Sequence, residues 1–130
     1  MLEKLLTETI EAIFDTLPVD LTFVDDTDTV RYYSKGDERI FRRTPAVIGR
    51  KVQNCHPQKS LHKVEQVVSD LKSGRRNVAE FWIDLKGRKV YIRYFAIRDK
   101  TGGYLGTLEV TQDITDLQKI EGQKRLLDEG

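Results

Sequence analysis

Cysteine is almost absent from this sequence. One cysteine in 130 residues leaves no partner for a disulfide within the chain, which points to a reducing compartment. Long hydrophobic runs are absent too, because no stretch approaches the roughly 18 consecutive apolar residues that a membrane-spanning helix needs. The opening segment MLEKLLTETIEAIF mixes acidic with apolar residues, unlike a secretory signal. We therefore expect a cytoplasmic protein without a membrane span.

An excess of charge of either sign is also missing. The 22 Lys and Arg residues and the 21 Asp and Glu residues leave a net charge of +1 at pH 7. Short basic pairs are dispersed among acidic residues, so we expect neither nucleic acid nor an anionic membrane as a partner. A chain of 130 residues with 38% hydrophobic and 33% charged residues is typical of one soluble globular domain.

The first half of the chain begins with an amphipathic helix. Residues 2–14 repeat apolar positions at helical spacing, and the residue before Pro18 disfavours helical backbone. The period then changes to two, so VDLTFVD and VRYYS are predicted strands joined by the turn DTDT. Residues 35–58 are irregular, with short helical pieces expected in DERIF and TPAVIG. Residues 60–73 predict a longer helix that ends at Gly74.

The last third of the chain predicts three strands and a closing helix. NVAEFWIDL turns at Lys86 and Gly87 into RKVYIRYFAIRD, which turns at KTGG into YLGTLEVTQD. The middle strand is apolar on both faces, so something must cover each side of the sheet. Four apolar residues of segment 114–130 occupy heptad positions, which predicts the start of a coiled-coil helix. These residues are Ile114, Leu117, Ile120 and Leu127.

This order of elements resembles that of a PAS sensor domain. The resemblance lies in DLTFVDDTDTVRYYS for the opening hairpin, VIGRKVQNCHP for the next junction, and GYLGTLEVTQDIT for the last strand and its exit. It implies an α+β fold: a five-stranded antiparallel sheet with a helical flap on one face and amphipathic N- and C-terminal helices. The implied division is an N-terminal helix at 1–17, a PAS core at 18–113 and a C-terminal signalling helix at 114–130. GRKVQNCHPQKS is also similar to a PAS subgroup found beside hemerythrin-like domains in multidomain bacterial chains.

The resemblance also implies a function. PAS domains are in general not enzymes; they enclose a small molecule between sheet and flap and signal through their terminal helices, usually in a homodimer. We expect a sensory module of a bacterial signalling chain, whose C-terminal helix contacts other domains or signalling proteins. The expected dimer interface is the apolar stripe of the first helix: Leu2, Leu6, Ile10 and Ile13. The alternative is a ligand-free PAS module with a filled core that serves protein–protein interaction only.

Cys55 and His56 are the clearest candidates for a site. In NCHP, His56 can bond to local backbone and Pro57 suits the first turn of a helix, which makes the pair a structural turn. The same pair could instead contact a ligand beneath the flap, or offer a thiolate and an imidazole to haem in a gas or redox sensor. A closed zinc site needs about four ligands, more than one cysteine and two histidines provide, so no metal site is expected.

Flavin chemistry and enzyme catalysis are both disfavoured. Flavin-binding photosensors among the PAS relatives carry a GRNCRFLQ-like stretch, with the reactive cysteine three residues after the glycine. Here Val52 stands three residues after Gly49, and Cys55 stands six residues after it. Catalysis at Cys55 would need a base and an orienting group, and the remaining histidine, His62, projects away from the apolar face of its helix. No glycine-rich phosphate loop follows a strand, so we do not expect an enzyme.

Alternation along the strands places four aromatic residues where they could line a pocket, with plain core packing as the alternative. These residues are Phe23, Tyr33, Trp82 and Tyr94. Arg93 shares a strand face with Tyr91 and Phe95. If Arg93 points inward it needs an anionic partner such as a ligand carboxylate, and if it points outward it belongs to the surface. The pattern does not identify the ligand, which is expected to be a small metabolite or absent.

Overall fold

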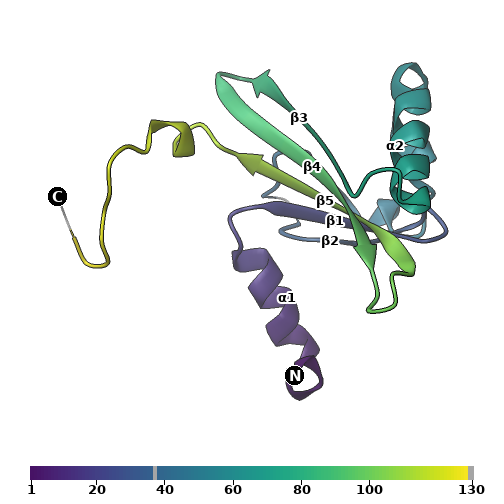
Figure 1. Ribbon diagram of the computed structural model, residues 1–130, viewed down its shortest axis with the longest axis horizontal. Coiled ribbons are helices and arrows are strands. Elements are labelled where there is room, and N and C mark those ends of the chain that lie inside the picture. Colours follow the sequence, from purple (N-terminus) through teal and green to yellow (C-terminus); the bar gives the residue numbers. More distant parts are fainter. Residues whose placement is uncertain (37, 129–130) are drawn as a thin grey trace.

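A five-stranded antiparallel sheet forms the centre of the fold, in the order β2-β1-β5-β4-β3 (Figure 1). The computed structural model describes residues 1–36 and 38–128, except for the side chain of Cys55. The strands are β1 (Asp20–Asp25), β2 (Val30–Tyr33), β3 (Val78–Leu85), β4 (Arg88–Arg98) and β5 (Tyr104–Asp113). The first and last strands are neighbours, because β1 pairs with β5. The α+β class and the five-stranded sheet predicted from the sequence are confirmed.

Local turn chemistry shapes the hairpins. β3 turns into β4 at Lys86 and Gly87, whose φ angles of 50° and 78° suit a tight two-residue turn. This turn was predicted at these residues. The β4–β5 turn is held by Asp99, whose Oδ1 accepts hydrogen bonds from the backbone N–H groups of Thr101 (2.9 Å) and Gly103 (2.8 Å).

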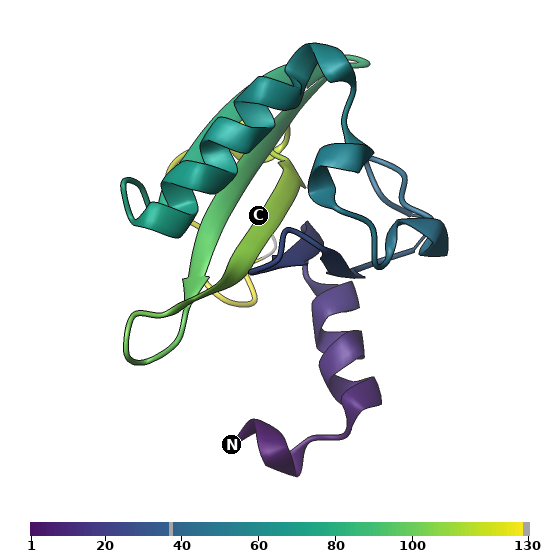
Figure 2. The same ribbon diagram turned by 90° about the vertical axis from the view of Figure 1, so that its right-hand side faces the viewer.

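The helix α2 (Leu61–Ser73) and an irregular flap, residues 41–60, lie on one side of the sheet (Figure 2). The flap contains the short 3-10 helices η2 (Pro45–Val47), η3 (Val52–Cys55) and η4 (Gln58–Ser60). α2 ends at Gly74, whose φ of 80° gives the predicted left-handed cap. Strands and α2 together supply the buried apolar residues, which are Leu21, Val24, Val30, Val68, Leu71, Ala79, Val90, Ile92 and Val110.

The helical piece predicted in DERIF, residues 37–41, is wrong for the part of it that the structure describes, which forms no helix. Arg39 explains the difference, because its side chain turns into the protein and is only 9% exposed. Its guanidinium donates hydrogen bonds to the carbonyl oxygens of Leu21 (2.8 Å) and Ser34 (2.9 Å) and to the hydroxyl of Thr22 (3.0 Å). These bonds hold the segment against β1 and favour its irregular path over a free helical turn.

The N-terminal segment forms two short helices rather than one. η1 (Leu2–Lys4) and α1 (Thr7–Thr16) are separated by extended backbone at Leu5 and Leu6. α1 has no buried residue and projects away from the sheet (Figure 1). Its end is fixed where Asp15 accepts a hydrogen bond from the backbone N–H of Lys35 (2.8 Å). The ring of Phe14 lies 5.8 Å from that of Tyr32, and the rest of the apolar side of α1 stays largely exposed in the single chain.

The predicted C-terminal helix, residues 114–130, is wrong over the described residues 114–128. That segment contains only the 3-10 turn η5 (Leu117–Lys119) and then runs away from the sheet (Figure 1). Two heptads without a partner do not offset the cost of nucleating a helix. Gly122 and Leu127 interrupt the segment further, with φ angles of 61° and 66°. Among the described residues, no helix is long and apolar enough to cross a membrane.

Candidate functional site

A cavity of about 600 Å³ lies between the sheet, α2 and the flap. Its wall is mainly apolar, and Ala79, Phe81 and Tyr94 contribute to it from β3 and β4. The other apolar lining residues are all valines: Val24, Val30, Val47, Val52, Val64, Val67 and Val68. Valine is short and its side chain is stiff, so the wall stays apolar and ordered without filling the space.

The helix presents one side to the cavity, because its lining residues are three or four positions apart. These residues, together with the cap residue before the helix, are Ser60, Lys63, Val64, Val67 and Val68. Val64 and Val68 lie on the apolar face of the helix. Leu71 of the same face is fully buried in the core. Lys63 is exposed, and no described residue forms an ion pair with it.

An ion pair spans the cavity from the flap to the sheet. Nη2 of Arg43 lies 3.1 Å from Oε2 of Glu109, and the two side chains are only 19% and 13% exposed. The second carboxylate oxygen of Glu109 accepts a hydrogen bond from the hydroxyl of Thr111 (3.4 Å). Nε of Arg43 is buried and has no hydrogen-bond partner among the described residues. Arg43 therefore keeps an unused donor beside the cavity.

Tyr94 is the neighbour of Glu109 across the β4–β5 pair, and both residues line the cavity. Burial, with a smaller contribution from the charge of Glu109, raises the pKa of Tyr94 well above its usual value. The phenol therefore stays protonated at physiological pH and keeps its O–H as a donor. No other residue in the described part of the chain receives a hydrogen bond from it, so this donor is also available.

His56 lies in the flap and lines the cavity. Its Nδ1–H donates a hydrogen bond to the carbonyl oxygen of Val52 (3.0 Å), which leaves Nε2 as an acceptor in the neutral ring. This bond is the local backbone contact that the structural interpretation predicted. The backbone of Cys55 belongs to η3, but its side chain lies outside the described part of the structure. His62, as expected, is exposed on α2.

The other predicted aromatic residues lie away from the cavity. Phe23 packs at Gly106, where an added Cβ would come within 2.6 Å of its ring. Tyr33 lies beneath the guanidinium of Arg39, 5.8 Å from the ring centroid. Trp82 is on the opposite face of β3 from Phe81 and is 61% exposed. Ligand contact by any of these residues stays a prediction that the cavity does not support.

Arg93 lies on the face of β4 that points away from the cavity. Its guanidinium stacks over the rings of Tyr91 (4.7 Å) and Phe95 (5.6 Å), and Nη2 donates to Oε1 of Gln112 (3.4 Å). Of the two orientations that the sequence left open, the structure has the outward one. Contact with these rings stabilises the guanidinium, whose Nε is buried and has no hydrogen-bond partner among the described residues.

Arg43, Lys63 and Glu109 are functional candidates that the sequence analysis missed. Nothing near Arg43 or Lys63 distinguishes them from surface cations. Glu109 had a signal, because Thr107, Glu109 and Thr111 place polar groups on alternate positions of a strand, between the apolar residues Leu108 and Val110. Such a polar stripe on one strand face indicates a polar lining rather than a dry core.

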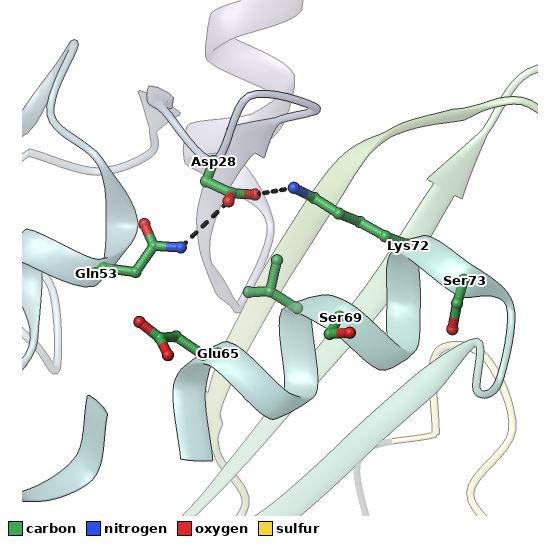
Figure 3. Close-up of a pocket in the computed structure, with 7 residues that line it drawn as sticks. Asp28, Gln53, Glu65, Ser69, Lys72 and Ser73 are labelled. Carbon is green, nitrogen blue, oxygen red and sulfur yellow. Dashed lines mark hydrogen bonds and ion pairs between the residues drawn. The ribbon is translucent and has the colours of Figure 1, made fainter. Parts of the chain in front are cut away.

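A second, shallower depression of about 440 Å³ lies beside the cavity, where Asp28 joins three elements (Figure 3). Its carboxylate accepts a hydrogen bond from Nε2 of Gln53 in the flap (3.1 Å) and pairs with Nζ of Lys72 on α2 (2.7 Å). The backbone carbonyl of Asp28 also accepts a hydrogen bond from the N–H of Val52 (2.7 Å). The β1–β2 turn thus fixes the flap and the helix that together enclose the cavity.

Comparison with known proteins identifies the fold family. A family model described as a PAS domain matches residues 10–115, from within α1 to just beyond β5. The chain belongs to the PAS domain family. The match confirms the resemblance seen in the sequence, and the matched segment contains every residue that lines the cavity. No curated protein matches the chain.

Solved structures share the architecture. A C-terminal domain from Streptococcus mutans is 37% identical, with a TM-score of 0.84 over 90% of this chain and 91% of that one. The PAS domain of Bordetella pertussis BvgS is 18% identical, with a TM-score of 0.61 over 86% of this chain and 90% of that one. A PAS domain from Colwellia psychrerythraea is 16% identical, with a TM-score of 0.60 over 84% and 97%. The likeness to the last two shows the fold alone.

Proposed function

We propose that this PAS domain is a sensory module that binds a small, largely apolar metabolite in its cavity. The valine-lined space of about 600 Å³ supports the proposal. A domain that served only as a scaffold would gain stability from filling such a space, because unfilled volume costs packing energy. PAS domains are in general sensors rather than enzymes, and this chain is proposed to be neither catalytic nor metal-binding.

Ligand binding is proposed to act on the flap and to be relayed by the segments that leave the PAS core. A ligand shifts a conformational equilibrium only if it contacts the two states differently, so it must contact a part that moves. Arg43 and His56 are flap residues in the cavity wall. The relay is proposed to operate in a homodimer of a cytoplasmic bacterial signalling protein. α1 would form the interface, and residues 114–128 would contact other domains or proteins.

Native mass spectrometry of the purified protein, combined with a visible absorption spectrum, tests this proposal. We expect extra mass from a bound small molecule that shows no visible absorption band. This extra mass should be lost in Val67→Phe, because the larger side chain fills the cavity. The matched control is Val78→Phe, at a residue that is 43% exposed and does not line the cavity, and it should keep the bound mass.

Two outcomes contradict the proposed metabolite sensor. A Soret or flavin band would replace it with a cofactor sensor in which His56 is the first candidate ligand. A bare mass, together with an unfolding temperature that no added metabolite changes, would favour the ligand-free interaction module. The uncovered apolar side of α1 is the observation that supports this second candidate.

A further inference from the structure

The cavity holds more unused hydrogen-bond donors than acceptors. Nε of Arg43, the O–H of Tyr94 and the ammonium of Lys63 have no partner among the described residues. Glu109, in contrast, already uses one carboxylate oxygen for Arg43 and the other for Thr111. A molecule that supplies negatively charged acceptors would complete this set, whereas a molecule that supplies donors would compete with it.

The charged groups of the wall lead to the same conclusion. Arg76 lines the cavity but is paired with Asp70, whose Oδ2 lies 3.0 Å from its Nε. Glu80 contributes to the cavity wall, but its exposed carboxylate lies on the other face of β3 from Ala79 and Phe81, where it accepts a hydrogen bond from the hydroxyl of Tyr91. Among the described charged side chains that face the cavity, this leaves the ammonium of Lys63 without a counter-ion. The wall is therefore electrostatically suited to an anion.

We infer that the ligand is a small aliphatic carboxylate, and that its carboxylate displaces Glu109 from Arg43. The inference rests on the proposed function, namely that the cavity binds a small molecule. The valines accommodate the hydrocarbon chain, and transfer of its CH₂ groups out of water supplies affinity without specificity. The carboxylate supplies the specificity, because a charge-assisted bond to a guanidinium is stronger than a bond between neutral groups.

Displacement of Glu109 links binding to the strand that leaves the domain. Arg43 belongs to the flap and Glu109 to β5, 66 residues apart in sequence, so exchange of the pair changes how the flap is held to the sheet. Thr111 already donates a hydrogen bond to the other oxygen of this carboxylate, and Tyr94 stands opposite Glu109 in the β4–β5 register. The ligand therefore replaces one contact between flap and sheet with a contact between flap and ligand. Because of this exchange, the ligand interacts differently with the two conformational states of the domain, as a sensor requires.

Isothermal titration calorimetry with three probes of equal chain length tests the inference. The probes are octanoate, 1-octanol and octylamine, which share the hydrocarbon chain and differ in their head group. We expect octanoate to bind about tenfold more tightly than 1-octanol, with octylamine weakest. Equal binding of octanoate and 1-octanol, or tightest binding of octylamine, would overturn the inference.

Variants of the ion pair separate the roles of its two members. Glu109→Gln removes the carboxylate that competes with the ligand for Arg43. This variant is expected to raise the affinity for octanoate about tenfold and to leave the affinity for 1-octanol unchanged. Arg43→Gln is expected to lower the affinity for octanoate to that for 1-octanol. Arg42→Gln, at the exposed neighbour, is the matched control and should change neither affinity. A Glu109→Gln variant with unchanged or weaker octanoate binding, despite normal 1-octanol binding, contradicts the displacement.

The experiment distinguishes this inference from the proposed function. Binding of 1-octanol verifies in every variant that the cavity is folded and accessible. If 1-octanol binds and octanoate has no advantage, the cavity is a ligand site and only the carboxylate is refuted. If none of the three probes binds the wild-type chain, the proposed ligand cavity and the inference are both overturned.

Discussion

Gly106 occupies a position on β5 where a larger residue does not fit. Its φ is 156°, and an added Cβ would lie 2.2 Å from the carbonyl oxygen of Val24 and 2.6 Å from the ring of Phe23. We predict that Gly106→Ala lowers the free energy of unfolding by about 3 kcal/mol or more, because strand backbone must shift to admit the methyl group. Urea denaturation measures this loss.

Gly36→Ala provides the control for Gly106. Gly36 also has a positive φ, of 50°, but nothing lies within 4 Å of an added Cβ. It should lose only about 1 kcal/mol, the conformational penalty alone. Equal losses in the two variants would show that the close approach at β5 is not what excludes a side chain.

Individual cavity residues were harder to predict than the cavity itself. The sequence placed Tyr94 and His56 at the site, and both line it. Phe23, Tyr33 and Trp82 do not line it, and their contact with a ligand stays a prediction. A period of two shows that a strand has two faces without showing which one is enclosed. Arg43 and Glu109 meet from positions 66 residues apart, and no local pattern encodes that contact.

Aspartate residues close several turns by the same pattern, Asp-x-Thr. Oδ1 of Asp25 accepts hydrogen bonds from the backbone N–H of Thr27 (2.9 Å) and from its hydroxyl (2.7 Å). Asp99 makes the equivalent pair of bonds with Thr101, at 2.9 and 2.7 Å. Side-chain hydrogen bonds to these threonines are the largest cause of the lowered pKa of both aspartates.

The end of β5 contains a third aspartate with a lowered pKa, Asp113. Hydrogen bonds from Arg88 and then Thr115 lower the pKa of Asp113 to about 2. In the unfolded chain the pKa of an aspartate is about 3.9. The folded chain therefore binds the protons of these three carboxylates more weakly than the unfolded chain does. The carboxylates therefore stabilise the fold above about pH 4, and this contribution is lost as the pH falls from about 4 towards about 2.

We predict a free energy of unfolding that is nearly constant from pH 7 to about pH 5 and falls steeply below about pH 4. In the triple variant Asp25→Asn, Asp99→Asn and Asp113→Asn, stability at pH 7 should be lower and the fall shallower. Urea titrations at a series of pH values measure both. Asp26→Asn, in the same turn as Asp25, is the control and should leave the curve unchanged. An equally steep fall in the triple variant contradicts the assignment.

An element could be predicted from the sequence when local residues stabilise it, and could not when distant contacts do. The Lys86–Gly87 hairpin and the Gly74 cap were predicted correctly because their turn geometry depends on the residues in place. The helix predicted for 114–130 depended on a partner that the sequence does not contain, and segment 114–128 is not α-helical. The helical piece predicted in DERIF is wrong because the hydrogen bonds of Arg39 to β1 and to Ser34, just after β2, outweigh local helical preference.

In the described part of the molecule, the N-terminal segment exposes an apolar surface. Leu2, Leu6 and Ile13 are 67%, 66% and 46% exposed, which fits the predicted dimer interface although the single chain does not test it. We predict that the double variant Leu6→Glu and Ile10→Glu weakens self-association by at least about a hundredfold, because charge replaces buried apolar contact. Sedimentation equilibrium measures the change.

Ala12→Glu adds the same charge on the opposite side of α1 and serves as the control. Ala12 is exposed, and its helical position is about 200° from that of Ile10. This variant should associate as the wild type does. A dimer that persists unchanged in the double variant would mean that α1 is not the interface.

The pairing of β1 with β5 also determines how the domain responds to tension. Asp20, at the start of β1, lies opposite Thr111, near the end of β5, so both flanking segments leave this strand pair at the same end. Tension applied through those segments loads the antiparallel hydrogen bonds one after another, as in unzipping, instead of all at once in shear. The domain is therefore mechanically soft along its own chain, and the first rungs to part lie next to Glu109.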